Sequence, residues 1–131
     1  ALAEALADAS PRVRAAAVTG LAAQRTTKHT RKIEGRLSDE REDLDVRAAA
    51  ARALGALCAG GASDRLTRLA LLARAPADEA DDRIGMAAIE ALAAIHPADL
   101  AKRLGPLRQK DVRLPVRRAV ERALAEPGAC R

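Results

Sequence analysis

The sequence contains no aromatic residue: Phe, Tyr and Trp are all absent from its 131 residues. A hydrophobic core must therefore be built from Leu, Ile, Val and Ala, and the 49% apolar content is sufficient for one. Because Ala is small, Ala-rich helices can pack near the close end of the usual ~8–10 Å interaxial range. We expect closely packed helices with an aliphatic core.

Cysteine and histidine are also scarce. The two cysteines, Cys58 at the end of a predicted helix and Cys130 in the C-terminal tail, imply no disulfide framework. A reducing, intracellular setting is therefore expected, cytoplasmic or alternatively nuclear. We interpret Cys58 as a buried small apolar residue rather than a nucleophile, because the sequence places no histidine beside it. The only histidines, His29 and His96, lie far apart, so we expect no metal site and no cofactor.

The chain also lacks a long apolar run and a signal sequence. No segment approaches the roughly 20 apolar residues of a membrane span, and the N-terminus has no basic-then-apolar pattern, so no membrane association is expected. The chain starts without Met, inside a helical pattern that includes Leu2 and Leu6. We expect a fragment of a longer array that self-associates through this cut N-terminal end.

An internal repeat organises what is present. The segment 43–57 can be aligned without gaps on three others, with anchor residues at Val13, Val46, Ile84 and Val116. The anchors are 33, 38 and 32 residues apart, and a Leu follows each by eight positions: Leu21, Leu54, Leu92 and Leu124. A helical pattern that repeats at this period predicts an α-solenoid.

Capping and breaking residues predict where the helices lie. Ser10-Pro11 suits a helix start and Asp43 an N-cap, whereas Gly60-Gly61 is a stop signal. The predicted helices are 11–24, a partly looped helix around Ile33 and Leu37, then 43–58, 63–75, 83–95, 97–109 divided at Gly105-Pro106, and one from Val112 or Pro115 to Glu126. The acidic segment 78–82 is expected to be a loop.

On these residues the chain resembles HEAT repeats, in which each unit is a pair of antiparallel helices. The resemblance implies an all-α solenoid of about four helix pairs, a HEAT-like or armadillo-like superhelix. We expect one array over residues 1–131, with units at about 1–24, 25–58, 63–96 and 97–126. Pro106 is similar to the proline that kinks the first helix of many such units.

The resemblance also implies a ladder of charged residues between neighbouring units. The positions that match the family pattern are acidic at Asp8, Glu79 and Asp111, and Arg at Arg14, Arg47 and Arg117. In the third unit Gly85 occupies the Arg position, so the ladder is expected to break there.

Charge is distributed in bands along the chain, whose net charge is +5. Residues 25–36 carry five bases and one acid, residues 77–99 six acids and one Arg, and residues 102–122 eight bases and two acids. In HEAT arrays the second helices usually line the concave side, where the aligned positions predict three candidate partner-binding residues: Arg52, Arg118 and Arg122. An acidic partner is expected near the last unit.

The favoured function is a non-catalytic scaffold that binds protein partners, since the resemblance is to a general interaction fold. One alternative is a nucleic-acid-binding segment that uses its basic side chains on phosphates. A second is a subunit of a bilin lyase, because such subunits also carry HEAT-like repeats. The sequence does not match two kinds of enzyme that carry HEAT-like repeats. Deoxyhypusine hydroxylases of the HEAT type bind metal through His-Glu pairs, and HEAT-like DNA glycosylases hold a damaged nucleotide with aromatic side chains. This sequence has neither feature.

Overall fold

The computed structural model describes residues 1–74 and 78–130, and every regular element in these ranges is a helix. The α-helices are α1 (Leu2–Ala5), α2 (Pro11–Ala23), α3 (Thr30–Ser38), α4 (Leu44–Ala56), α5 (Ser63–Ala70), α6 (Glu79–Ile95), α7 (Leu100–Leu104) and α8 (Leu114–Ala125). Short 3-10 segments are η1 (Gly60–Ala62), η2 (Leu71–Ala73) and η3 (Gly105–Arg108). The prediction of an all-α solenoid is confirmed.

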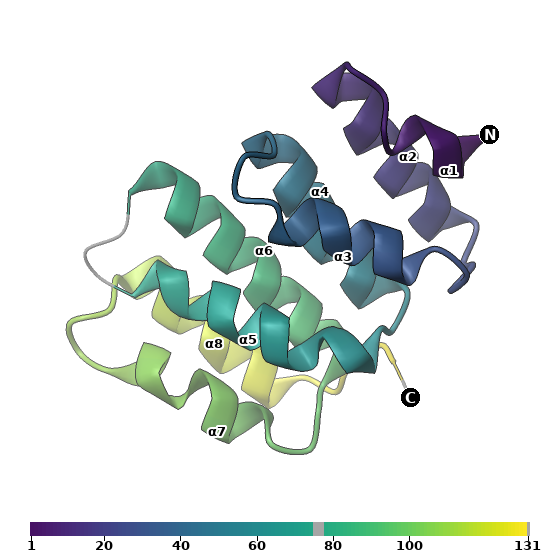
Figure 1. Cartoon of the computed structure of the whole chain (residues 1–131). Helices are drawn as coiled ribbons and strands as arrows, with labels where there is room; N and C mark the ends of the chain where they lie inside the picture. Colours follow the sequence, from purple (N-terminus) through teal and green to yellow (C-terminus); the bar gives the residue numbers. More distant parts are fainter. Residues whose placement is uncertain (75–77, 131) are drawn as a thin grey trace.

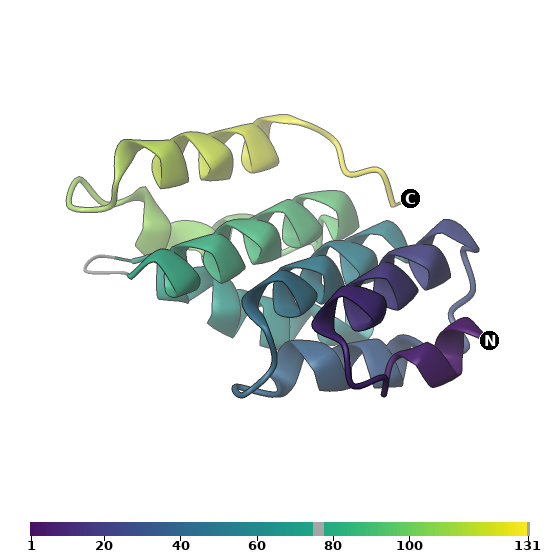
Figure 2. The ribbon, with the colours of Figure 1, turned by 90° about the horizontal axis from the view of Figure 1, so that it is seen from above.

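The helices form two layers. Helices α2, α4, α6 and α8 lie side by side in chain order in one layer, and the first helix of each pair lies in the other (Figures 1 and 2). Contacts join consecutive second helices, α2 with α4, α4 with α6 and α6 with α8. This stacking buries the apolar face of each helix against a neighbour, as expected of a repeat array.

Three of the second helices, α2, α4 and α6, begin after a residue whose side chain caps them. The Ser10 side chain accepts a hydrogen bond from the Val13 backbone N–H, and Asp43 accepts one from that of Asp45. The expected loop at 78–82 is wrong, because Asp78 caps α6 and the next four residues form its first turn. Acidic side chains favour this position because the helix N-terminus carries partial positive charge. The predicted stop at Pro76 lies outside the described residues.

The core consists of the repeated aliphatic positions. The anchor residues Val46, Ile84 and Val116 are fully or almost fully buried. The aligned leucines are buried as well, except for the partly buried Leu124. Val13, the anchor of the first pair, is instead 40% exposed. We attribute this to the lack of a preceding second helix beside α2 in the described structure, since α4, α6 and α8 each pack against the one before.

At the N-terminal end, the two leucines expected to form an exposed apolar surface for self-association are largely buried. Leu6 is buried, and Leu2 is half-buried with its side chain against Gly20 of α2. The exposed large apolar side chain at this end is therefore Val13.

Helices α4 and α6 are in close backbone contact. A Cβ atom added at Gly55 would lie 2.7 Å from the Ala91 Cα atom, so this crossing requires glycine. Gly85 has the same role against the other layer, because a Cβ atom there would lie 2.7 Å from the Cβ atom of Ala73. The departure from the repeat pattern at Gly85 thus has a packing reason: the helix layers approach too closely for an arginine.

Three second helices are followed by a residue in the left-handed conformation at the same aligned position. These residues are Arg25, Cys58 and His96, each twelve positions after its anchor, with φ values of 54°, 55° and 51°. Such residues end helices because the chain must turn sharply away from the helix axis.

The interpretation of Cys58 as a buried apolar residue is wrong. Cys58 lies in the exposed turn after α4 and forms a disulfide with Cys130, across a Cα–Cα distance of 5.5 Å. The two residues are 72 positions apart in sequence, so spacing alone gave no sign that they meet. The expected intracellular setting rested on the absence of such a bond. No helix in the described ranges is both long and apolar enough to cross a membrane.

Candidate partner-binding surface

Ion pairs connect neighbouring second helices. Arg83 at the start of α6 lies 2.6 Å from the Asp45 carboxylate of α4, and Arg52 of α4 lies 3.0 Å from Glu90 of α6. Arg113, the N-cap residue of α8, pairs with Asp82 of α6. These pairs are at least partly exposed, and each contributes at most about 1 kcal/mol.

Glu42 forms the most buried charged cluster. Its side chain is 1% exposed and binds Arg14 of α2 at 2.6 Å and Arg36 of α3 at 3.1 Å. It also accepts a hydrogen bond from the Asp43 backbone N–H. Burial opposes ionisation, but the Arg14 hydrogen bond, the backbone donor and the two arginine charges outweigh it and lower the pKa of Glu42. The first two helix pairs are thus joined by a charged carboxylate that the sequence analysis passed over.

The predicted ladder arginines share a different contact: each donates to a backbone carbonyl oxygen that precedes its own helix. This oxygen lies in the inter-helix turn for Arg14 and Arg117 and in the last turn of α3 for Arg47. Arg14 donates to the Asp8 and Ala9 carbonyls, Arg47 to that of Leu37 at 2.9 Å, and Arg117 to that of Val112 at 3.1 Å. Each arginine therefore connects its helix to the backbone that precedes it, and Arg14 alone of the three also forms an ion pair with the next pair in the described structure.

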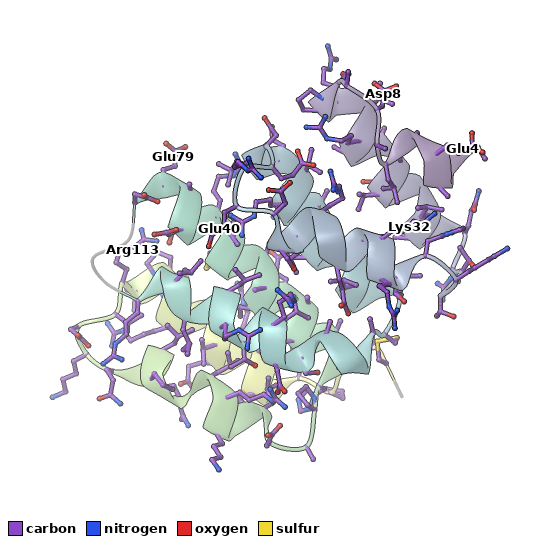
Figure 3. All side chains as sticks on the ribbon, in the orientation of Figure 1. Glu4, Asp8, Lys32, Glu40, Glu79 and Arg113 are labelled. Carbon is purple, nitrogen blue, oxygen red and sulfur yellow. A yellow bond between two sulfur atoms is a disulfide. The ribbon has the colours of Figure 1, made fainter. Side chains whose placement is uncertain are left out.

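The predicted acidic ladder positions lie at the starts of the second helices. Asp8 accepts a hydrogen bond from the Ser10 backbone N–H, in the turn between α1 and α2. Figure 3 shows Asp8 in that turn and Glu79 far from it, at the first turn of α6. Within the described ranges no ion pair joins Asp8, Glu79 or Asp111 to an arginine. A ladder through these carboxylates stays a prediction.

Two of the three candidate partner-binding residues lie in one row with Glu90. Arg52 pairs with Glu90, and Glu90 and Arg122 line the same groove between α6 and α8. Arg52 is thus already engaged with a carboxylate, although its side chain is 54% exposed. Arg122 is exposed, and in the described residues no ion pair involves it.

Arg118 lies beside Arg122 at a shallow hollow on α8. Its lining combines basic, acidic and apolar side chains: Arg108, Leu114, Arg117, Arg118, Glu121 and Arg122. Arg108 pairs with Glu121 at 3.1 Å, whereas no ion pair to Arg118 occurs in the described part of the chain. Leu114 is 47% exposed, the highest value among the large apolar side chains that the structure leaves exposed. We name Leu114, Arg118 and Arg122 the α8 surface.

Sequence reasoning identified the arginines of this surface but missed Leu114. The residue directly precedes Pro115 and begins α8, and its helix phase differs from that of the buried Val116. The sequence feature that could have indicated this exposed residue is a leucine two positions before the anchor Val116, outside the repeated apolar positions. Over residues 1–74 and 78–130, no group of three or more His, Cys, Asp or Glu side chains could hold a metal ion.

Comparison with known proteins agrees with the helix pairing. The family model for HEAT repeats matches residues 1–79, which include α1 to α5 and η2. No curated protein matches the chain. Because the family model covers more than half of the sequence, the chain belongs to the HEAT-repeat family.

Proposed function

We propose that this chain is a non-catalytic scaffold segment whose α8 surface binds an acidic segment of a protein partner. HEAT repeats are generally protein-interaction scaffolds, which makes a protein partner the natural class. The proposal for α8 depends on one observation: an exposed leucine adjoins two arginines that no carboxylate of the described chain engages. Arginine is one of the residues enriched among those that contribute most to interface binding energy.

The chemistry of Arg118 and Arg122 favours carboxylates. A guanidinium group can donate two parallel hydrogen bonds to one carboxylate, which gives geometric specificity as well as energy. Other arginines nearby are less available, because Arg108 is paired with Glu121 and Arg113 with Asp82. Arg117 is half-buried and holds its own turn. Among the described residues, the surface therefore offers two arginines without an ion pair beside one apolar side chain.

This arrangement also bears on the nucleic-acid alternative. A phosphate-binding surface gains affinity from many unpaired basic groups acting together. On α7 and α8 several of the bases are instead neutralised by carboxylates, including Arg103 by Asp64 and Asp99. This distribution of paired bases supports a protein partner. The experiment below also tests for binding to DNA.

The test uses a fluorescently labelled synthetic peptide that combines Asp and Glu with one Leu. The protein is titrated into the peptide, and the binding affinity is measured by fluorescence anisotropy. Arg118→Glu combined with Arg122→Glu should lower the affinity about tenfold or more, a loss of about 1.4 kcal/mol or more in binding free energy. Helix content by circular dichroism should be unchanged, because both side chains are exposed.

A matched control changes the charge equally on another surface. Arg31→Glu combined with Lys32→Glu alters two exposed residues of α3, in the other basic band, and should leave peptide affinity within about twofold. Equal losses in both double variants would mean that net charge, and not the α8 surface, determines binding. If the chain binds duplex DNA with an affinity comparable to its affinity for the peptide, and this affinity falls as salt is added, the nucleic-acid function is favoured.

A further inference from the structure

The C-terminal tail, residues 126–130, returns from the end of α8 across α6 to the end of α4. In Figure 2 the chain leaves α8 and runs back toward the other second helices. The Cys130 backbone N–H donates to the Ala94 carbonyl at 3.0 Å, and the Cys130 sulfur is bonded to that of Cys58. The tail thus connects the last helix pair to the second, passing over the one between them.

The tail forms one wall of the groove between α6 and α8. The groove is lined from α6 by Met86, Ile89, Glu90, Ala93 and Ala94, from α8 by Ala119, Arg122 and Ala123, and from the tail by Glu126, Pro127 and Ala129. Its floor is largely apolar, since the two helices contribute mostly Ala, Ile and Met. Movement of the tail would therefore change access to this groove at the end near Ala94.

Few hydrogen bonds hold the tail. From residue 127 to 130, the backbone hydrogen bond that the structure gives outside helices is the one from Cys130 to Ala94. The Cys130 sulfur also lies 3.4 Å from the Gly55 carbonyl oxygen, but a disulfide sulfur carries no proton and cannot donate. Gly128 passes so close to α6 that a Cβ atom would lie 2.5 Å from the His96 Cβ atom. This approach demands glycine but supplies no hydrogen bond.

We propose that the Cys58–Cys130 disulfide is a thiol-controlled clasp that fastens the tail over the groove, and that its reduction releases the tail. A dithiol is the reductant. One of its thiolates attacks the sulfur of Cys58, the more exposed residue, and forms a mixed disulfide as the Cys130 thiolate leaves. The second thiol of the reductant then displaces Cys58 and forms a cyclic disulfide. Two electrons and two protons pass to the protein, which gains two thiols, and the dithiol is oxidised.

This inference goes beyond the proposed function and does not depend on it. The cysteines lie at the end of α4 and in the tail, and the α8 surface shares only Arg122 with the groove that the tail borders. A failure of peptide binding at α8 would leave the clasp untouched, and the clasp can be tested without any partner.

The test is backbone amide relaxation of the full chain by NMR, with and without dithiothreitol. In the oxidised chain the amides of Gly128, Ala129 and Cys130 should have order parameters near those of α6, about 0.85. After reduction they should fall below about 0.6, while the amides of α4, α6 and α8 keep their values. Titration with a thiol reagent should give no reactive thiol before reduction and two after it.

The Cys58→Ser variant distinguishes the effect of losing the disulfide from any other effect of the reductant. This variant keeps Cys130 and its contacts with α6 but cannot form the intramolecular bond, so its tail should be mobile from the start and insensitive to dithiothreitol. An ordered tail in this variant or in the reduced chain would overturn the clasp, because the remaining contacts would suffice. Loss of the helices on reduction would overturn it as well, since the bond would then be a requirement for folding and not a control of the tail.

Discussion

At the scale of single residues, Glu42 shows how a charge can be buried at a helix junction. Its carboxylate is satisfied by two arginines from different helices and by a backbone donor. Such a site costs desolvation, and removal of its charge leaves the arginines without a partner. Because its pKa is lowered in the folded chain, the stabilisation is present above the ordinary glutamate pKa and is lost as the pH falls through the lowered value.

We predict that Glu42→Gln lowers the free energy of unfolding by about 1–3 kcal/mol at pH 7. The difference from the unaltered chain should shrink as the pH falls through the lowered pKa of Glu42, because the carboxyl group is then protonated. Urea melts at pH 7 and at a pH below that lowered pKa provide the measurement. The control is Glu40→Gln, two positions earlier and exposed, which should change stability by less than about 0.5 kcal/mol. A constant difference for Glu42→Gln at both pH values would contradict a charged, paired carboxylate.

The phase of α4 is tested by two residues two positions apart. Leu54 is fully buried, so Leu54→Ala should cost about 2–5 kcal/mol by leaving a cavity. Arg52→Ala removes one exposed ion pair with Glu90 and should cost less than about 1 kcal/mol. Chemical denaturation of both variants measures the difference. Equal losses would show that the two side chains do not face core and solvent as described.

At the scale of elements, glycines set the spacing of the helices. Gly55 allows the backbone of α4 to approach α6 at Ala91, whereas Gly35 of α3 has no atom within 4 Å of its would-be Cβ position. In an open helical site, alanine is the better helix former by about 1 kcal/mol. In a closed site, the added methyl group forces the helices apart.

Two matched substitutions separate these effects. Gly55→Ala should destabilise the chain by about 1–3 kcal/mol despite the gain in helix propensity. Gly35→Ala should stabilise it by up to about 1 kcal/mol. Thermal melts of the two variants compare them directly. Stabilisation by both would mean that α4 and α6 are not in the close contact seen at Ala91.

The elements also show what the sequence could predict. Caps at Ser10 and Asp43 and the break at Gly105-Pro106 depend on local chemistry, so the corresponding helix boundaries were predicted correctly. The start of α6 was not, because an acidic segment is compatible with both a loop and a first helical turn.

The candidate site was only partly predictable from the sequence. Repeat alignment placed Arg118 and Arg122 on the second-helix layer, but it could not show which arginines are already paired, as Arg52 is. Ion pairing depends on side chains from neighbouring repeats, and the repeats differ in length by several residues. The disulfide was missed for a related reason, since it joins the turn after α4 to the C-terminal tail, which only the stacking of α4, α6 and α8 brings together.

At the scale of the whole molecule, the disulfide modifies the usual behaviour of a solenoid. In a repeat array each unit contacts only its neighbours, so a terminal unit can unfold by itself. Here the bond between Cys58 and Cys130 closes a loop of 72 positions that contains α5 to α8. Unfolding of the last helices should therefore be coupled to the end of α4 while the bond is intact.

We predict that reduction lowers the free energy of unfolding by about 2–4 kcal/mol, because the cross-link restricts the unfolded chain. Urea melts with and without dithiothreitol measure the change, and Cys130→Ser should reproduce the reduced value without responding to dithiothreitol. Equal stability in both conditions would show that the bond adds nothing to the packing of the helices.

The central claim, that the α8 surface recognises a protein segment and not merely negative charge, is tested most directly by Leu114→Ala. The measurement is the affinity for the acidic Leu-containing peptide at low and high salt, with an all-acidic peptide lacking Leu as the comparison. We predict a loss of about three- to tenfold for the Leu-containing peptide at both salt concentrations, since an apolar contact is not screened by ions. Unchanged affinity for that peptide, with binding to both peptides abolished by salt, would contradict the claim.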